Sequence, residues 1–136
     1  MEAFTIERKI NLPLEKVWMA MAEFNKSRDP EIKVVVEKEG DTNAGGAGTI
    51  RTLARGDVSV REIVDSVNPL DSITYRIIDN PFLEEYHGKI NFKDERDATM
   101  IKWNVYFKPK DPSHGSFLSS LSKDFINAII DSLEKQ

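Results

Sequence analysis

The stretch from Ser116 to Glu134 constrains the fold most, because it predicts one long amphipathic helix near the end of the chain. Ile126 and Ile130 widen its apolar stripe, so the helix needs a broad apolar partner surface. Asp111 can cap the helix, and Pro112 suits its first position. The stripe itself recurs at steps of three and four, the spacing of one helix face, and consists of Phe117, Leu118, Leu121, Phe125, Ala128, Ile129 and Leu133.

The segments before this helix read mostly as strands, so the helix is expected to lie on a sheet or to be gripped by it. Pro13 opens a short helix that runs past Trp18, and Phe24 continues it or follows it in a second short turn. We expect a single domain over residues 1–136. Alternation of apolar and polar residues predicts strands at Phe4–Ile10, Ile32–Glu39, Thr49–Arg55, Val58–Val67, Ser72–Ile77, Tyr86–Lys93 and Ala98–Lys108.

Turn positions predict the register of two hairpins. A two-residue turn at Gly56-Asp57 places Arg51 opposite Glu62. A four-residue loop at Asp94–Asp97 places Gly88 opposite Trp103, where the glycine leaves room for the indole. The residues that then share the inner face with Arg51 and Glu62 are Leu53, Val58, Val60, Val64, Ile73, Tyr75 and Ile77.

Composition excludes several classes of function. The net charge is −4 and the sequence has no basic run, which argues against nucleic-acid binding. Cysteine is absent, so disulfides, thiolate metal sites and cysteine nucleophiles are excluded. No segment approaches the roughly 20 apolar residues of a membrane span, and Met1–Lys9 does not read as a secretory signal. We therefore expect a cytoplasmic protein without membrane insertion, as a monomer or homodimer.

Common catalytic and cofactor motifs do not fit this sequence. The glycines of Gly45–Gly48 precede a predicted strand without a Lys-Ser/Thr pair, so they read as a connection and not as a phosphate-binding loop. His87 and His114 lack a second ligand at metal spacing. No Gly-x-Ser-x-Gly elbow supports a serine triad, and the serines around the terminal helix read as small, solvated or packing positions. We expect no metal and no cofactor.

Several stretches together resemble the START-like, or helix-grip, superfamily, which includes polyketide cyclase/dehydrase-like and birch pollen allergen-like (SRPBCC) proteins. The matching stretches are Pro13–Trp18, Gly46–Arg51, Val60–Ile63, Ser72–Ile77 and Thr99–Val105, followed by the terminal helix. The resemblance implies an α+β fold: a seven-stranded antiparallel sheet wrapped around a long C-terminal helix, with two short helices after the first strand. It also implies an apolar cavity, but the superfamily contains both ligand carriers and cyclases.

Three functions remain open from the sequence. The first is binding or transport of a small apolar or amphipathic ligand, lipid-like or polyketide-like, in the cavity. The second is a cyclase or dehydratase that uses Glu62, Arg51 and Tyr75. In the third, Trp103, Phe125 and Tyr86 fill the cavity and a protein–protein role remains.

The candidate binding residues follow from the first of these functions. Arg51 and Glu62 either orient the ligand or form an ordinary cross-strand ion pair. Phe82 and Leu83 form a lid at the entrance, with the glycine loop Asp41–Gly48 nearby, or else Phe82 plugs the core. The full expected ligand-binding set is Arg51, Leu53, Val60, Glu62, Val64, Tyr75, Ile77, Phe82, Tyr86, Trp103, Leu121 and Phe125.

Overall fold

The expected strands, the short helix after Pro13 and the long terminal helix are present in the computed structural model, which describes residues 2–22, 31–40 and 46–134. The second short helix, expected around Phe24, falls in residues 23–30, outside the described residues. In chain order the elements are β1 (Glu2–Ile10), α1 (Leu14–Ala22), β2 (Ile32–Lys38), β3 (Ile50–Arg55), β4 (Val58–Asn68), β5 (Ser72–Ile78), β6 (Leu83–Asp94), β7 (Thr99–Pro109), the short 3-10 helix η1 (Pro112–His114) and α2 (Gly115–Glu134).

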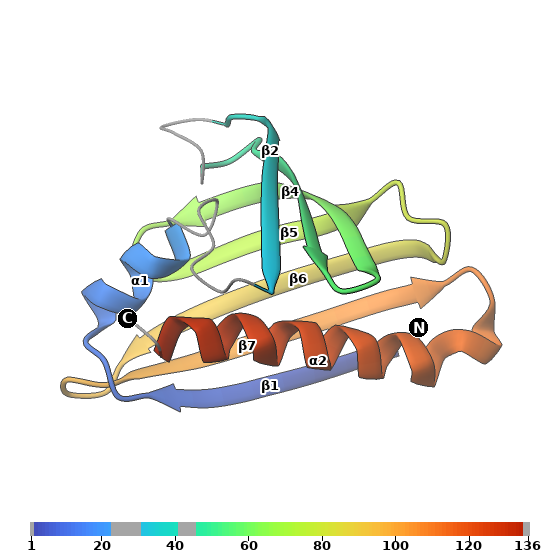
Figure 1. The fold of residues 1–136 in the computed structure, drawn as a ribbon. Helices are drawn as coiled ribbons and strands as arrows, with labels where there is room; N and C mark the ends of the chain where they lie inside the picture. Colours follow the sequence, from blue (N-terminus) through green and yellow to red (C-terminus); the bar gives the residue numbers. More distant parts are fainter. Residues whose placement is uncertain (1, 23–30, 41–45, 135–136) are drawn as a thin grey trace.

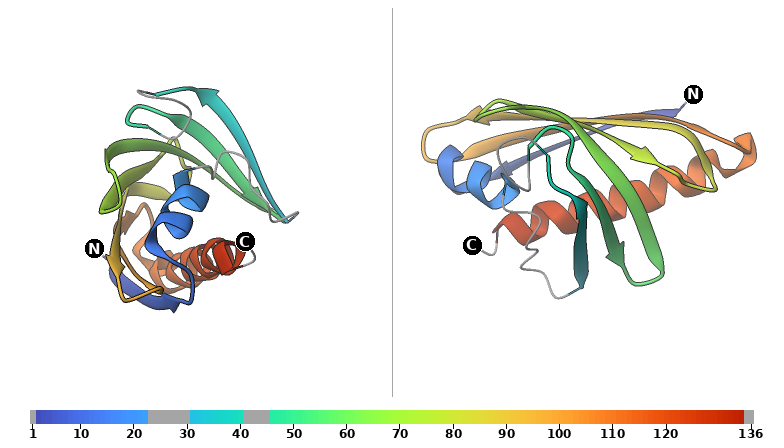
Figure 2. Two further views of the ribbon diagram at one scale, coloured as in Figure 1. Left: turned by 90° about the vertical axis from the view of Figure 1, so that its left-hand side faces the viewer. Right: turned by 90° about the horizontal axis from the view of Figure 1, so that it is seen from above.

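The strands form one antiparallel sheet in the order β1-β7-β6-β5-β4-β3-β2, with β1 and β2 at its edges. The sheet curves around α2, which crosses its concave side (Figures 1 and 2). α1 lies at the end of the sheet where α2 finishes (Figure 1). The helix-grip fold expected from the sequence is therefore confirmed.

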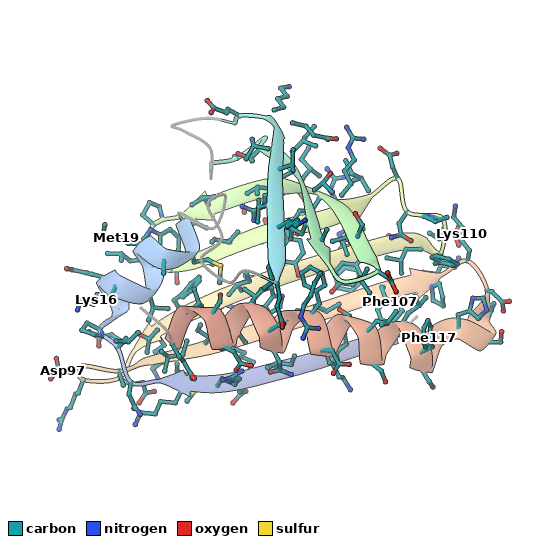
Figure 3. The ribbon with its side chains drawn as sticks, viewed as in Figure 1. Lys16, Met19, Asp97, Phe107, Lys110 and Phe117 are labelled. Atoms are coloured by element: carbon teal, nitrogen blue, oxygen red, sulfur yellow. The ribbon has the colours of Figure 1, made fainter. Side chains whose placement is uncertain are left out.

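The long helix is held by its apolar face, as its spacing predicts. Phe125, Ile126, Ile129, Ile130 and Leu133 are all buried in the core between α2 and the sheet. From the sheet side, Phe107 of β7 is fully buried, and Figure 3 shows it beside the first half of α2. Burial of apolar area is the main driving force that fixes the helix against the strands.

Phe117 is the exception to the predicted stripe, because 64% of it is exposed. It lies on the first turns of α2 (Figure 3). On a helical wheel it sits at the margin of the face that Leu118 and Phe125 define. Its inclusion in the buried stripe was wrong, since spacing alone does not show where the covering sheet ends.

The N-terminal cap lies at η1, the 3-10 turn that precedes α2. Asp111 is the N-cap, and its carboxylate accepts a hydrogen bond of 2.9 Å from the backbone N–H of Ser113. Pro112 opens η1, and α2 continues from Gly115. The predicted cap is confirmed, with a 3-10 turn between it and the α-helix.

Arg8 of β1 fastens the other end of α2. Its guanidinium lies 2.8 Å from the Asp131 carboxylate and 3.2 Å from that of Glu134, and it also donates to the Asn127 backbone carbonyl. These contacts are partly exposed, so each stabilises modestly. They explain how Arg8 is accommodated beside Ile6 and Ile10 on the inner face of β1.

The register of the β3–β4 hairpin is as predicted, with Arg51 opposite Glu62. The register of the last hairpin was wrong: Trp103 faces Ile90, and Gly88 faces Val105 on β7. Pairing extends to Asp94 and Thr99, one residue beyond the predicted start of the loop. Each residue of β6 therefore pairs with a β7 residue two positions later than predicted, and because two positions is the repeat of a strand, the same side chains still face the core.

Gly88 makes room for a different ring from the one expected. It pairs with Tyr75 across β5 and β6, and a Cβ atom at position 88 would lie 2.3 Å from the Tyr75 ring. The glycine therefore lets the Tyr75 ring lie flat over the backbone of β6. The sequence identified a close approach at this glycine but assigned it to the wrong neighbour.

Replacement of Phe125 tests whether the helix is gripped. We expect Phe125→Ala to lower the free energy of unfolding by about 3–5 kcal/mol, because a buried ring is lost. Phe117→Ala, the same change on the same helix at an exposed position, is the control and should change it by about 0.5 kcal/mol or less. Urea denaturation measures both. Equal midpoints for the two variants would contradict the burial of Phe125.

Candidate ligand cavity

A cavity of about 250 Å³ lies between the concave face of the sheet and α2. Trp103, Phe125 and Tyr86 stand in its wall and do not fill it, so the expectation of a filled cavity is not met. The apolar part of the wall comes from every strand between β3 and β7 and from one face of α2.

All the expected ligand-binding residues except Val64 line this cavity. Val64 is 1% exposed and packs within the core, outside the cavity wall. The alternation of β3, β4 and β5 was sufficient to find most of the wall, because inward residues of neighbouring strands meet there. Three lining residues outside the expected set were still placed near it, Leu83 in the lid and Val58 and Ile73 on the inner face. The lining residues that the sequence analysis did not connect with the site are Met21, Asp57, Ser59, Asn80, Pro81, Ile90, Phe107, Leu118, Ser122, Ile126 and Ile129.

Ser122 is the most consequential of these missed residues. It was taken as a small, solvated or packing position without a role in the site, but it lines the cavity and its hydroxyl hydrogen-bonds the Tyr86 hydroxyl. The signal was available in the sequence, because Ser122 interrupts the apolar stripe between Leu118 and Phe125. A polar residue on the buried face of a helix needs a partner, and here the partner is on β6.

Arg51 and Glu62 close on each other inside the cavity wall. The Arg51 Nε donates to Glu62 Oε1 over 2.7 Å, and the two side chains are only 10% and 7% exposed. A buried pair of opposite charges is stable only when its members stay together, since either alone would be an uncompensated charge. The cross-strand ion pair is therefore present, and both of its members also line the cavity.

Tyr75 and Trp103 form a second buried polar pair. The Trp103 indole N–H donates to the Tyr75 hydroxyl over 2.9 Å, and the rings meet edge to face with centroids 6.1 Å apart. Tyr86 lies beside Tyr75, with ring centroids 6.3 Å apart. Tyr75, Tyr86 and Trp103 thus form a second polar group on β5, β6 and β7, and Ser122 of α2 joins it through its hydrogen bond with Tyr86.

Burial keeps both tyrosine hydroxyls protonated well above neutral pH. It raises the pKa of Tyr75 well above its usual value near 10. It also raises the pKa of Tyr86 to about 12, although the hydrogen bond with Ser122 opposes that shift. Protonated phenols can donate hydrogen bonds and do not act as bases, so at neutral pH both hydroxyls are neutral polar groups of the wall.

The rim of the cavity includes the predicted lid. Phe82 is 54% exposed and lines the cavity, and Leu83 is half-buried against the core. The Asn80 side chain accepts from the Phe82 backbone N–H, and the Phe82 carbonyl accepts from the N–H of Lys110. Phe82 is therefore a rim residue and not a buried plug.

The glycine loop does not adjoin this rim in its described part. Gly46–Gly48 are absent from the cavity wall, and the Gly48 N–H donates to the Val64 carbonyl over 2.8 Å. Figure 1 shows this end of β3 away from the β5–β6 loop that carries Phe82. The expectation that the two loops lie together was wrong for these residues, and Asp41–Gly45 lie outside the described residues.

The described ranges offer no metal centre: no three His, Asp or Glu side chains in them gather closely enough to hold an ion. The helices that the structure describes are also too short or too polar to cross a membrane. What the site presents is an apolar chamber with an internal ion pair and a small group of neutral hydroxyls.

A family model described as polyketide cyclase/dehydrase and lipid transport matches residues 1–136. The chain belongs to this family. None of the curated proteins matches it. The matched range is the whole sequence, so the family assignment covers every strand and both helices described above.

Solved structures share the fold at low sequence identity. Ara h 8.0201 is 19% identical with a TM-score of 0.79, and the match covers 98% of this chain and 95% of that chain. The Zhui aromatase/cyclase from a Streptomyces species is 13% identical with a TM-score of 0.78, covering 98% and 92%. A START superfamily protein from Mycobacterium smegmatis is 10% identical with a TM-score of 0.74, covering 98% and 94%.

The raised tyrosine pKa values predict that stability falls at alkaline pH. In an unfolded chain the pKa of tyrosine is about 10, whereas burial raises the pKa of Tyr86 to about 12 in the folded state. Between these values the unfolded state binds fewer protons, so the free energy of unfolding decreases as pH rises. Urea titrations across this range should show a smaller decrease for Tyr86→Phe than for the parent. Equal decreases would contradict the burial of this hydroxyl.

Proposed function

We propose that this family member binds and carries a small, mostly apolar ligand in the cavity between the sheet and α2. The observation that supports the proposal best is the cavity itself, an apolar chamber with a few convergent polar groups. Ligand sites are built in this way, with apolar surface for affinity and few polar groups for orientation. The cytoplasmic location and the monomeric or dimeric state expected from the sequence stay predictions.

The size of the cavity limits the ligand. At about 250 Å³ it is slightly smaller than the roughly 300–1,000 Å³ of pockets that hold drug-sized molecules. A cavity of about 150 Å³ holds a single benzene ring. The ligand is therefore a compact molecule of one or two rings, or a short chain of similar volume.

Binding fits the polar groups better than the cyclase or dehydratase alternative does. A general base must reach an acidic proton of the substrate. Glu62 is the carboxylate nearest to that role, but its Oε1 accepts from Arg51. Tyr75 and Tyr86 stay protonated at neutral pH. These groups hold and orient a molecule, and enzymatic activity stays the alternative.

Filling the cavity tests this function directly. Val60→Trp places an indole on the inner face of β4, and we expect binding of the uncharged naphthalene dye prodan to weaken roughly tenfold or more because the ligand's volume is taken. Val35→Trp is the matched control, since Val35 is 61% exposed on β2 and does not line the cavity. Fluorescence titration measures both. Equal weakening by the two variants, or no prodan binding to the parent, would overturn the proposal.

The lid hypothesis predicts faster exchange without loss of stability. Phe82→Ser removes an exposed ring at the rim, so stability should change by about 0.5 kcal/mol or less, while bound prodan leaves faster. Phe117→Ser, at a similarly exposed phenylalanine that does not line the cavity, should leave the rate unchanged. Stopped-flow fluorescence gives the dissociation rates. A large loss of stability in Phe82→Ser with an unaltered rate would assign Phe82 to the core.

A further inference from the structure

The charges inside the cavity wall compensate each other. Arg51 and Glu62 are paired at 2.7 Å and both are buried. Among the described residues of the wall, the remaining charged one is Asp57, which is exposed at the β3–β4 turn. A charged ligand would leave water to enter a chamber whose charges are already matched, and such desolvation is unfavourable unless a counter-charge is available.

The wall nevertheless has a hydrogen-bond donor to offer. The Trp103 indole has only a donor, so the Tyr75 oxygen must accept from it, and the Tyr75 proton is not used in that bond. Tyr86 and Ser122 share one hydrogen bond. Together they carry two hydroxyl protons, so one of these also lies outside the bond. The Tyr75 hydroxyl also donates to the Tyr86 oxygen. The three hydroxyls therefore carry three protons for two hydrogen bonds, and one proton remains to donate to an acceptor on a ligand.

The field at these hydroxyls disfavours negative charge. Burial is the main reason that the pKa values of Tyr75 and Tyr86 are raised, and the Glu62 carboxylate adds to the rise in both. The same carboxylate would repel an anionic group placed beside these hydroxyls. The geometry of the hydroxyls and the sign of the field thus point to the same kind of ligand.

We propose that the cavity takes an uncharged ligand with a hydrogen-bond acceptor, such as a ketone, and excludes the matching carboxylate. This inference rests on the proposed function and narrows it. The apolar body of the ligand lies against the aliphatic wall, and its acceptor lies at the hydroxyls of Tyr75, Tyr86 and Ser122. The ligand must therefore carry a hydrogen-bond acceptor at one end and no net charge.

Three naphthalenes of nearly equal size separate these requirements. Acetylnaphthalene carries an acceptor without charge, isopropylnaphthalene lacks the acceptor, and naphthoate carries a negative charge at the same ring position. Displacement of prodan at neutral pH gives their relative affinities. We expect the ketone to bind roughly threefold to tenfold more tightly than the hydrocarbon, as one added hydrogen bond implies. Naphthoate should bind more weakly than either.

Variants assign the preference to the named hydroxyls. Tyr86→Phe combined with Ser122→Ala removes two of the three linked hydroxyls and leaves only that of Tyr75, which still accepts from the Trp103 indole. In this double variant the advantage of the ketone over the hydrocarbon should shrink. Tyr106→Phe is the control, because Tyr106 is exposed on the outer face of β7 and should retain the parent's preference. If thermal unfolding shows that the double variant does not fold, Tyr86→Phe alone is compared.

The outcomes distinguish this inference from the function on which it rests. Binding of all three probes without discrimination, or tightest binding of naphthoate, would overturn the inference and leave the carrier function standing. If the double variant keeps the full preference for the ketone, the hydroxyls of Tyr86 and Ser122 do not cause that preference, and the inference is also overturned. Failure of every probe and of prodan to bind would overturn both.

Discussion

Burial of the apolar face of α2 is the constraint on which the rest of this structure depends. The helix carries an apolar stripe too broad for any narrow partner, and the curved sheet is the surface that covers it. The ends of the helix are then fixed by polar contacts, the Asp111 cap at the start and Arg8 near the finish. The cavity is what remains where the sheet curves away from the helix faster than side chains can fill the space.

The polar groups of the cavity follow from the same constraint. A hydroxyl, an indole N–H or a charge that faces inward from a strand cannot reach water, so it must find a partner across the sheet or on the helix. Arg51 with Glu62, Tyr75 with Trp103 and Tyr86 with Ser122 are three solutions to this requirement. These pairings fix the positions of the buried polar groups in the wall, and the proposed preference for an uncharged ligand with an acceptor rests on them.

The elements that could be predicted from the sequence are those with a strong local pattern. The terminal helix, the strands and the Arg51–Glu62 pairing follow from periodicity and a two-residue turn. The last hairpin was displaced because pairing runs one residue further than turn composition suggests, to Asp94 and Thr99. Ser122 is visible in the sequence as a polar break in the apolar stripe, but its partner could not be predicted, because Tyr86 lies 36 residues away and no local pattern joins them.

Gly88 also determines how deep the cavity is, although it is not among the residues of its wall. Any side chain at this position would meet the Tyr75 ring at its Cβ atom. The ring would have to tilt into the chamber, and its hydroxyl would leave the Trp103 indole without an acceptor. The volume available to a ligand therefore depends partly on Gly88, which lies behind the Tyr75 ring and has no side chain to displace it. The shape of the cavity could therefore be changed by a substitution at position 88, without a change to any residue that lines it.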